Sequence, residues 1–287
     1  ILNIILDPIF IFDLESFGGF GFGLGIAGAA MATVISQVVV FIVFIFMLFF
    51  KNHSYISFNL SDFTFSTDII WDIIKVGLPA SLSMIVMAVG QGVFNKILVH
   101  ISVNTVAAYQ VAGRLDMLVF LPIFSIAASL TTLVGMFYGA KEYRALRYII
   151  KYGIFSALLI TIISSTIVYT FAGHVVRFFT DDASIVIIAV NFLQIFAFAY
   201  PFISVGITTG RVLQGLGKGL PVLIITIVRV LGVSAPLALF FVFIMDKTVE
   251  WVWYSMMLST IVAFGIGLTW LISTLKTLPT SGQSLNN

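Results

Sequence analysis

The chain has 287 residues, of which 60% are hydrophobic and only 9% are charged. A soluble domain carries about 25% charged residues, so the composition excludes an ordinary soluble protein and indicates that lipid is the main solvent. The net charge of +2 is too small to indicate a nucleic-acid partner, and a sequence without cysteine excludes disulfides, a thiol nucleophile and a thiolate metal site.

The first apolar run, Ile1 to Phe12, is too short to cross a bilayer, which takes about 20 residues. The chain begins with Ile rather than Met, and it has neither a charged n-region nor a small-residue cleavage site, so the run does not have the pattern of a signal peptide. We therefore expect an N-terminally truncated fragment whose first residues are the second half of a membrane helix.

Seven longer apolar runs follow, each long enough for a spanning helix. Their hydrophobicity is continuous rather than alternating as in barrel strands, and open backbone cannot face lipid, so we expect an all-α polytopic membrane protein. The predicted spans are residues 24–50, 76–101, 103–140, 152–176, 183–210, 219–245 and 251–275.

The longest polar stretch between the spans, KNHSYISFNLSDFTFSTDII, divides the chain into two parts. We predict that residues 1–50 are the remnant of a first lobe, that 51–70 form an inter-lobe linker, and that 71–276 form a second lobe of six spans. Residues 277–287 then form a C-terminal tail.

Basic residues gather in alternate connections, whereas the connections between them are neutral or acidic. By the positive-inside rule the basic connections, and with them the linker and the C-terminus, are cytoplasmic. The basic set comprises Lys51, Lys75, Lys141, Arg144, Arg147, Lys151, Arg211, Lys218 and Lys276.

Asp7 is the most informative residue because it lies in the middle of an apolar run. Asn3, four residues earlier, shares its helix face, and Pro8 has no N–H to donate to the carbonyl of Ile4, which favours a kink. An ionised Asp in mid-membrane costs roughly 2.5–3.5 kcal/mol, so desolvation favours the protonated form. Such an acid can couple proton flow to a change of shape. The alternative is that Asp7 lies near the water interface and only caps or kinks a helix.

Two arginines lie within later spans, Arg114 about 11 residues and Arg229 about ten residues from a span end, which is near mid-bilayer at a rise of about 1.5 Å per residue. Since neither loses its charge, each needs a carboxylate, carbonyls or water, and we expect both to point into the second lobe. Gln110 shares a face with Arg114, whereas Asp116, the acid at similar depth, does not. These four residues either hold helices together or line a substrate cavity.

Residues 23–28, GLGIAG, match the G-x-G-x-x-G pattern of dinucleotide sites, but a membrane span follows and no acid appears until Asp62. We instead expect the small residues to allow close helix packing. The three histidines share no i, i+4 spacing and have no acid to complete a metal triad, so we expect no metal site.

Five segments, in order, resemble the multidrug and toxic compound extrusion (MATE) family, and the similarity extends from Ile1 to about Lys276. The resemblance implies a two-lobe (6+6) fold of twelve helices, of which this chain holds the second half of helix 5 through helix 12, with residues 51–70 joining the lobes. The segments are LNIILDPIFIF, GIAGAAMATVISQ, VGLPASLSMIVMAVGQGVFNKIL, GRLDMLVFLPIFSIAASLTTLVGMFYGAK and LQGLGKG.

The branch that the chain resembles includes the DNA-damage-inducible F proteins. By this resemblance Asn3, Asp7 and Thr33 belong to a proton-responsive polar cluster, whose remaining member, an Asp on the first helix, would precede Ile1. Another branch has a Glu at the position of Met87 and binds sodium in its second lobe. The Met at this position argues against that arrangement here.

We therefore predict a secondary antiporter, not an enzyme, that exports amphipathic organic cations in exchange for H⁺ or Na⁺ by alternating access. The resemblance implies a multi-pass plasma-membrane protein, monomeric when full length, with no cofactor beyond the coupling ion. The alternative is a flippase of the same superfamily for lipid-linked precursors or polysaccharides, which Arg114 and Arg229 keep open. An intramembrane enzyme needs paired acids, a Ser–His pair or a metal motif at matched depth, and the sequence shows none of these. A channel needs rings of charge or filter repeats, which the sequence also does not show.

Overall fold

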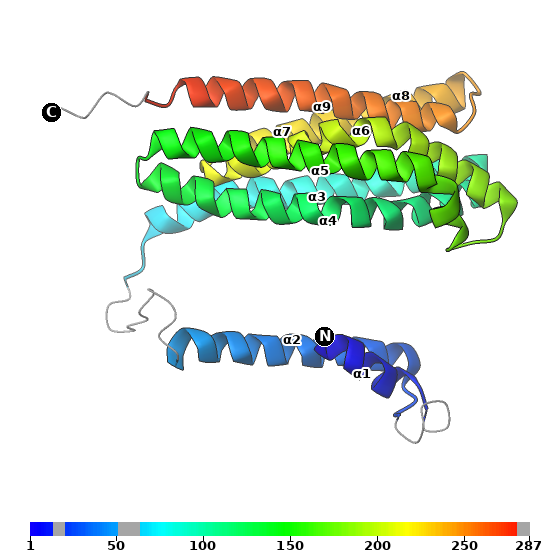
Figure 1. Ribbon diagram of the computed structural model, residues 1–287, viewed down its shortest axis with the longest axis horizontal. Coiled ribbons are helices and arrows are strands. Elements are labelled where there is room, and N and C mark those ends of the chain that lie inside the picture. Colours follow the sequence, from blue (N-terminus) through cyan, green and yellow to red (C-terminus); the bar gives the residue numbers. More distant parts are fainter. Residues whose placement is uncertain (14–20, 51–63, 280–287) are drawn as a thin grey trace. The chain divides into compact units, whose positions relative to one another are not determined.

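A computed structural model describes residues 1–13, 21–50 and 64–279, and every regular element in these ranges is helical (Figure 1). The described residues contain seven helices that are long and apolar enough to cross a membrane, as the sequence predicts. The chain divides into two compact units, Ile1–Phe65 and Ser66–Asn287. Each unit has its own polar site.

The first unit is a hairpin of α1 (Leu2–Ile11) and α2 (Gly25–Phe50). The backbone on both sides of the connection pairs closely: the amide of Phe22 donates to the carbonyl of Ile9 at 2.9 Å, and that of Leu24 to the carbonyl of Phe10 at 3.0 Å. A Cβ added at Gly28 would lie 2.2 Å from the carbonyl oxygen of Phe10. The expectation of close helix packing at GLGIAG is therefore confirmed for Gly28.

The second unit is a bundle of long helices in which α6 is central and packs against α4, α5 and α9 (Figure 1). Its largest buried side chains include Trp253 on α9 and Tyr200 and Phe192 on α6. Five helices are uninterrupted: α3 (Thr67–Ile101), α4 (Val103–Gly139), α5 (Tyr143–Arg177), α6 (Ala183–Gly215) and α9 (Glu250–Lys276).

The remaining span, Leu220–Ile244, alternates between two helix types. It consists of α7 (Leu220–Ile227), the π-helical η2 (Val228–Ser234), α8 (Ala235–Leu239) and the π-helical η3 (Phe240–Ile244). A proline ring clashes with the carbonyl four residues earlier, which for Pro236 is that of Gly232 inside η2, and the wider π turn relieves such a clash. Arg229 lies in η2, so the irregular turn carries the charged residue of this span.

Helix α3 begins earlier than the sequence suggested. Residues 67–70, which we assigned to the linker, form its first turn. The hydroxyl of Ser66 accepts a hydrogen bond from the amide of Ile69 at 3.5 Å, and Asp68 lies in the first turn, where an acid complements the helix dipole. The boundary predicted at residue 70 is therefore wrong. Residues 51–63 of the predicted linker lie outside the described residues.

Two basic side chains, Arg147 near the start of α5 and Lys218 in the connection between α6 and α7, meet at the C-terminal end of α9. Arg147 donates to the carbonyl oxygens of Leu275 at 3.1 Å and Leu278 at 2.8 Å, and the Lys218 ammonium lies 3.3 Å from the hydroxyl of Thr274. The last carbonyls of a helix have no partner within the helix and carry its negative pole. The basic connections of the second unit therefore also stabilise the end of its last helix.

Candidate functional site

The first unit brings Asn3, Asp7 and Thr33 together. Nδ2 of Asn3 donates to Oδ1 of Asp7 at 3.1 Å and lies 3.3 Å from the hydroxyl oxygen of Thr33. The Thr33 hydroxyl itself donates to the carbonyl of Ala29 at 3.0 Å, so its oxygen is oriented to accept from Asn3. One amide nitrogen thus connects the carboxylate on α1 with a hydroxyl on α2.

Local geometry produces this arrangement. Asn3 and Asp7 are one turn apart on α1, and the close approach at Gly28 holds α2 against α1. Ala32 is fully buried, whereas the neighbouring Thr33 is exposed and Asn3 and Asp7 are half-buried. Among the described residues the hydrogen bond from Asn3 is the one that Asp7 accepts, so most of its carboxylate lone pairs remain available to a proton or a cation.

The second unit contains a polar cavity of about 190 Å³. Asp116 of α4 and Arg229 of η2 both line it, together with Gln91 of α3. The hydroxyl of Tyr200 on α6 donates a hydrogen bond to the carboxylate of Asp116. Within the residues that the structure describes, no ion pair joins Asp116 to Arg229, so opposite charges share one cavity without touching.

Aromatic rings form one wall of this cavity. Tyr109 stacks on Trp253 with ring centroids 5.8 Å apart and meets Phe192 edge-on at 5.6 Å. Tyr109, Asp116 and Arg229 all line the cavity. Because Trp253 is fully buried, the polar groups are held by a packed aromatic cluster.

The structure separates the four residues that we grouped in the second lobe. Asp116 and Arg229 line the cavity, but Arg114 and Gln110 are exposed on the opposite side of α4. The expectation that Arg114 points into the interior is therefore wrong. The side chains of residues two apart on a helix point in directions that differ by about 200°. Arg114, two residues after Ala112, therefore points away from the buried face of α4, on which Ala112 and Val119 lie.

The sequence reasoning missed Tyr200, which donates to Asp116 from outside the cavity lining. It also missed the other polar residues that line the cavity: Gln91, Tyr109, Ser234, Ser259 and Thr260. Tyr109 lies seven residues before Asp116, hence on the same helix face, and this spacing could have indicated it. Tyr200 is 84 residues away from Asp116, and no local pattern connects the two. Among the described residues, no group of three or more His, Asp and Glu could hold a metal ion.

Comparison with known proteins gives one consistent family. The MatE family profile matches residues 79–240. "Probable multidrug resistance protein NorM" from Thermotoga maritima is 29% identical over 238 residues, which are 83% of this chain and 50% of that protein. "Multidrug export protein MepA" from Staphylococcus aureus is 32% identical over 218 residues, which are 76% of this chain and 46% of that protein. The chain thus spans about half the length of these curated relatives.

Solved structures agree with the sequence comparisons. A crystal structure described as MATE in the straight conformation has a TM-score of 0.88 and 32% identity, and the match covers 96% of this chain and 60% of that one. An outward-facing conformation of a multidrug resistance MATE family transporter of the MOP superfamily has a TM-score of 0.86 and 32% identity, with 98% and 61% coverage.

Proposed function

Since the chain belongs to the MATE family of transporters, we propose that it is part of a secondary antiporter that exports amphipathic organic cations in exchange for H⁺ or Na⁺. One related protein is named as a probable multidrug resistance protein and another as a multidrug export protein, which supports a transporter rather than an enzyme. The proposal extends that kind of activity to the protein of which this chain is a part.

The hydrogen-bonded group of Asn3, Asp7 and Thr33 is the observation that carries the proposal. When Asp7 is ionised, its carboxylate accepts from Nδ2 of Asn3. When Asp7 is protonated it becomes a hydrogen-bond donor, so it competes less well for the Asn3 amide, and the share of that amide held by Thr33 grows. Proton or cation exchange at Asp7 thus changes the contact between α1 and α2.

Pro8 gives this exchange a mechanical output. It lies inside α1 directly after Asp7 and has no N–H for the carbonyl of Ile4. A helix that lacks one backbone hydrogen bond bends more easily at that turn. In the proposed cycle, occupancy of Asp7 biases the bend of α1, and alternating access of the two lobes follows from that bias.

The proposed setting is the plasma membrane, with the protein a monomer. The basic connections of the second unit lie at the end of the bundle where α9 terminates, which supports a cytoplasmic C-terminus by the positive-inside rule. A flippase for lipid-linked precursors remains the second candidate, because the exposed Arg114 and the cavity residue Arg229 give the middle of this unit a positive charge.

The proposal is tested by export of a fluorescent cationic dye from liposomes that contain the full-length protein. A pH gradient and a sodium gradient are imposed in separate experiments. Asp7→Asn keeps the shape of the side chain but cannot exchange a proton and binds a cation poorly, so export should fall to the level of protein-free liposomes. Asp72→Asn is the matched control, because Asp72 is an exposed acid paired with Lys75 near the start of α3. Full export by the Asp7→Asn protein under both gradients would refute the coupling role.

A further inference from the structure

Arg114 places a permanent charge on the outer face of the second unit. It lies about 11 residues into α4, which puts it within the hydrocarbon thickness at a rise of about 1.5 Å per residue. Its guanidinium forms no hydrogen bond or ion pair within the described part of the chain. An arginine at this depth is costly against acyl chains, so this face of α4 has to meet water, a ligand or polar groups of another segment.

Amide side chains of α3 and α4 lie along the same turns as Arg114. Nε2 of Gln110, one turn before Arg114, lies 3.4 Å from Oδ1 of Asn95 on α3. Helices α3 and α4 run antiparallel through the turn at Ser102, so Gln91, one turn before Asn95, lies on the turn of α3 that corresponds to Arg114 on α4. We refer to Gln91, Asn95, Gln110 and Arg114 as the amide–arginine strip.

The strip has an excess of hydrogen-bond donors. A guanidinium has five N–H groups and each amide has two, and the single bond between Gln110 and Asn95 uses one of them. A planar guanidinium flanked by amides matches the geometry of carboxylate and phosphate oxygens.

Little negative charge is available to neutralise the strip. In the described part of the second unit, Asp116 is the acid within the bundle, on the other side of α4, where its carboxylate accepts from Tyr200. Arg229 adds a second positive charge in the cavity that Gln91 also lines. The other described acids lie at or near helix ends: Asp68, Asp72, Glu142, Asp181, Asp182, Asp246 and Glu250.

Exposed apolar side chains continue the same helix faces beyond the strip. Met84 and Met87 of α3 are 74% and 52% exposed, and Met117 and Leu121 of α4 are 64% and 49% exposed. Met87 and Met117 lie four and three positions from Gln91 and Arg114, and Met84 and Leu121 lie seven positions from them, which keeps all four on the same side of each helix. Flexible methionines adapt to ligands of different shape, so the surface combines an anion-binding group with an apolar bed.

We propose that the amide–arginine strip binds the acidic group of an amphipathic ligand, a carboxylate, sulfonate or phosphate, while the neighbouring methionines contact its apolar body. The inference rests on the proposed export function and extends its substrates from organic cations to amphoteric and anionic amphiphiles. Arg114 holds the acidic group by paired N–H donors, and Gln91 and Gln110 orient it.

The test compares two dyes that differ in one group. The affinity of the purified full-length protein is measured for a rhodamine with a free carboxylate and for its methyl ester, without any ion gradient. The wild-type protein should bind the free acid more tightly, and Arg114→Gln should reduce this preference by about tenfold or more, because a charge-assisted bidentate contact is lost. Arg114→Lys should retain part of the preference, since lysine keeps the positive charge but lacks the planar pair of N–H donors.

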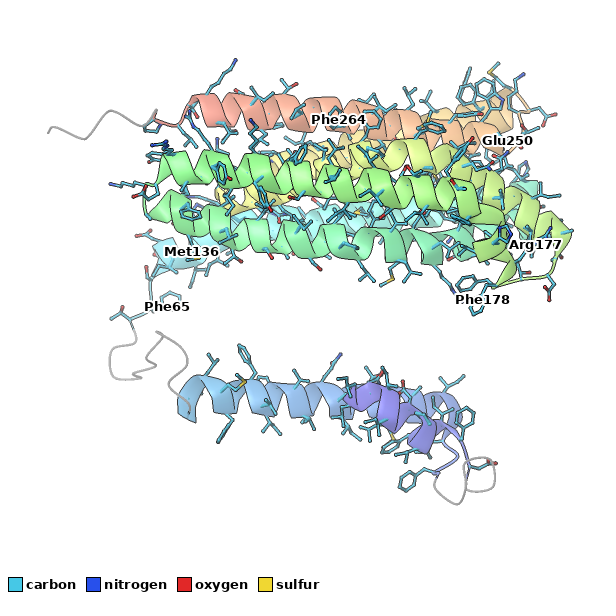
Figure 2. The ribbon with its side chains drawn as sticks, in the orientation of Figure 1. Phe65, Met136, Arg177, Phe178, Glu250 and Phe264 are labelled. Atoms are coloured by element: carbon cyan, nitrogen blue, oxygen red, sulfur yellow. The ribbon has the colours of Figure 1, made fainter. Side chains whose placement is uncertain are left out.

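Arg177→Gln is the matched control, with the same change of charge. Arg177 lies at the end of α5, at the end of the bundle opposite Met136 (Figure 2). The Arg177→Gln protein should prefer the free acid over the methyl ester as strongly as the wild-type protein does. Equal binding of both dyes by the wild type, or an unchanged preference in Arg114→Gln, would overturn the proposal. Should Arg114→Gln fail to fold, Gln110→Met decides, with a smaller loss of preference expected and no loss contradicting the site.

Competition by an anionic lipid identifies the source of the acidic group. Displacement of the dye by phosphatidic acid in the wild type but not in Arg114→Gln would assign the strip to a lipid phosphate. Binding unaffected by this lipid would assign it to the carboxylate of a free compound. Binding is measured without a gradient, so the ratio of affinities for the free acid and the methyl ester does not depend on the coupling role of Asp7. A negative result for the strip and a negative result for the export proposal can therefore be distinguished.

Discussion

The two units hold their acids in opposite ways. In the first unit, Asp7 is half-buried, accepts one hydrogen bond from a residue four positions away and remains open to exchange. In the second unit, Asp116 faces a cavity walled by aromatic rings and is held by Tyr200 from a helix far along the chain. The difference indicates that the first acid suits a switch, which needs access and a weak partner, and that the second suits a fixed polar core.

The largest expected effect comes from removing the ring that packs behind the aromatic wall of the second unit's cavity. Trp253→Ala deletes a fully buried side chain that packs on Tyr109 and Phe192. A loss of about 3–5 kcal/mol of unfolding free energy is expected for such a cavity. Thermal unfolding of the full-length protein in detergent measures it. A loss below about 1 kcal/mol would contradict the view that this wall holds the Asp116 site rigidly.

The equivalent change in the first unit acts on the close contact between its helices. In Gly28→Val, the new Cβ would lie 2.2 Å from the carbonyl oxygen of Phe10. Because this distance is too short, α1 has to move away from α2. We expect a destabilisation of about 1–3 kcal/mol and loss of export, because the contact from Asn3 to Thr33 opens. Gly92→Val on α3 is the control, since a Cβ there meets no atom within 4 Å. Equal export by the two variants would show that the hairpin contact does not matter.

Smaller effects are expected at the partners of Asp7. Asn3→Ala and Thr33→Ala each remove one hydrogen bond of about 0.5–1.5 kcal/mol, so gradient-driven export should fall by up to about tenfold rather than vanish. Asn3→Ala should have the larger effect because Asn3 contacts the carboxylate directly. Initial rates of dye efflux measure both variants. A complete loss of export in Thr33→Ala would indicate that the exchange depends on Thr33 of α2 rather than on Asp7.

The smallest effect concerns an acid that lies outside both sites. Asp182 caps α6: its Oδ1 accepts from the hydroxyl of Ser184 at 2.7 Å and from the backbone amides of Ser184 and Ile185 at 2.8 and 3.3 Å. These bonds, the Ser184 hydroxyl first, hold the pKa of Asp182 below its usual value. The pKa is lower in the folded state, so this capping contribution is complete above the unfolded pKa and is lost as the pH falls through the folded one.

Asp182→Asn should keep the cap, because Asn caps about as well as Asp, while removing this acid dependence. Hydrogen exchange of the first amides of α6, followed as the pH is lowered, measures the difference. In the wild type, protection relative to the Asn variant should decrease on acidification. Parallel curves for the two proteins would show that the cap does not titrate.

Much of the fold follows from the sequence because lipid imposes few solutions. Runs of about 20 apolar residues become helices, since no other open structure satisfies its backbone in a bilayer. The pairing of Asn3 with Asp7 was predictable from a four-residue spacing, whereas Thr33 was indicated only by the family resemblance. Wherever one turn of helix decides the geometry, the sequence suffices.

The second unit shows where local reasoning ends. The direction of Arg114 depends on which face of α4 is buried, and mostly apolar spans do not show this, because lipid and core prefer similar residues. The partner of Asp116 comes from α6, and the π-helical turn around Arg229 depends on how the chain accommodates Pro236. These features arise from packing between distant segments.

The central claim is that the exchangeable acid lies in the first unit, and it is tested most directly by comparing Asp7→Asn with Asp116→Asn in the same assay. Export is measured in liposomes under an imposed pH gradient and under a sodium gradient, normalised to the amount of folded protein. The account predicts that Asp7→Asn loses gradient-driven export whereas Asp116→Asn retains it. Retention by Asp7→Asn together with loss in Asp116→Asn would place the coupling acid in the second unit and contradict the account.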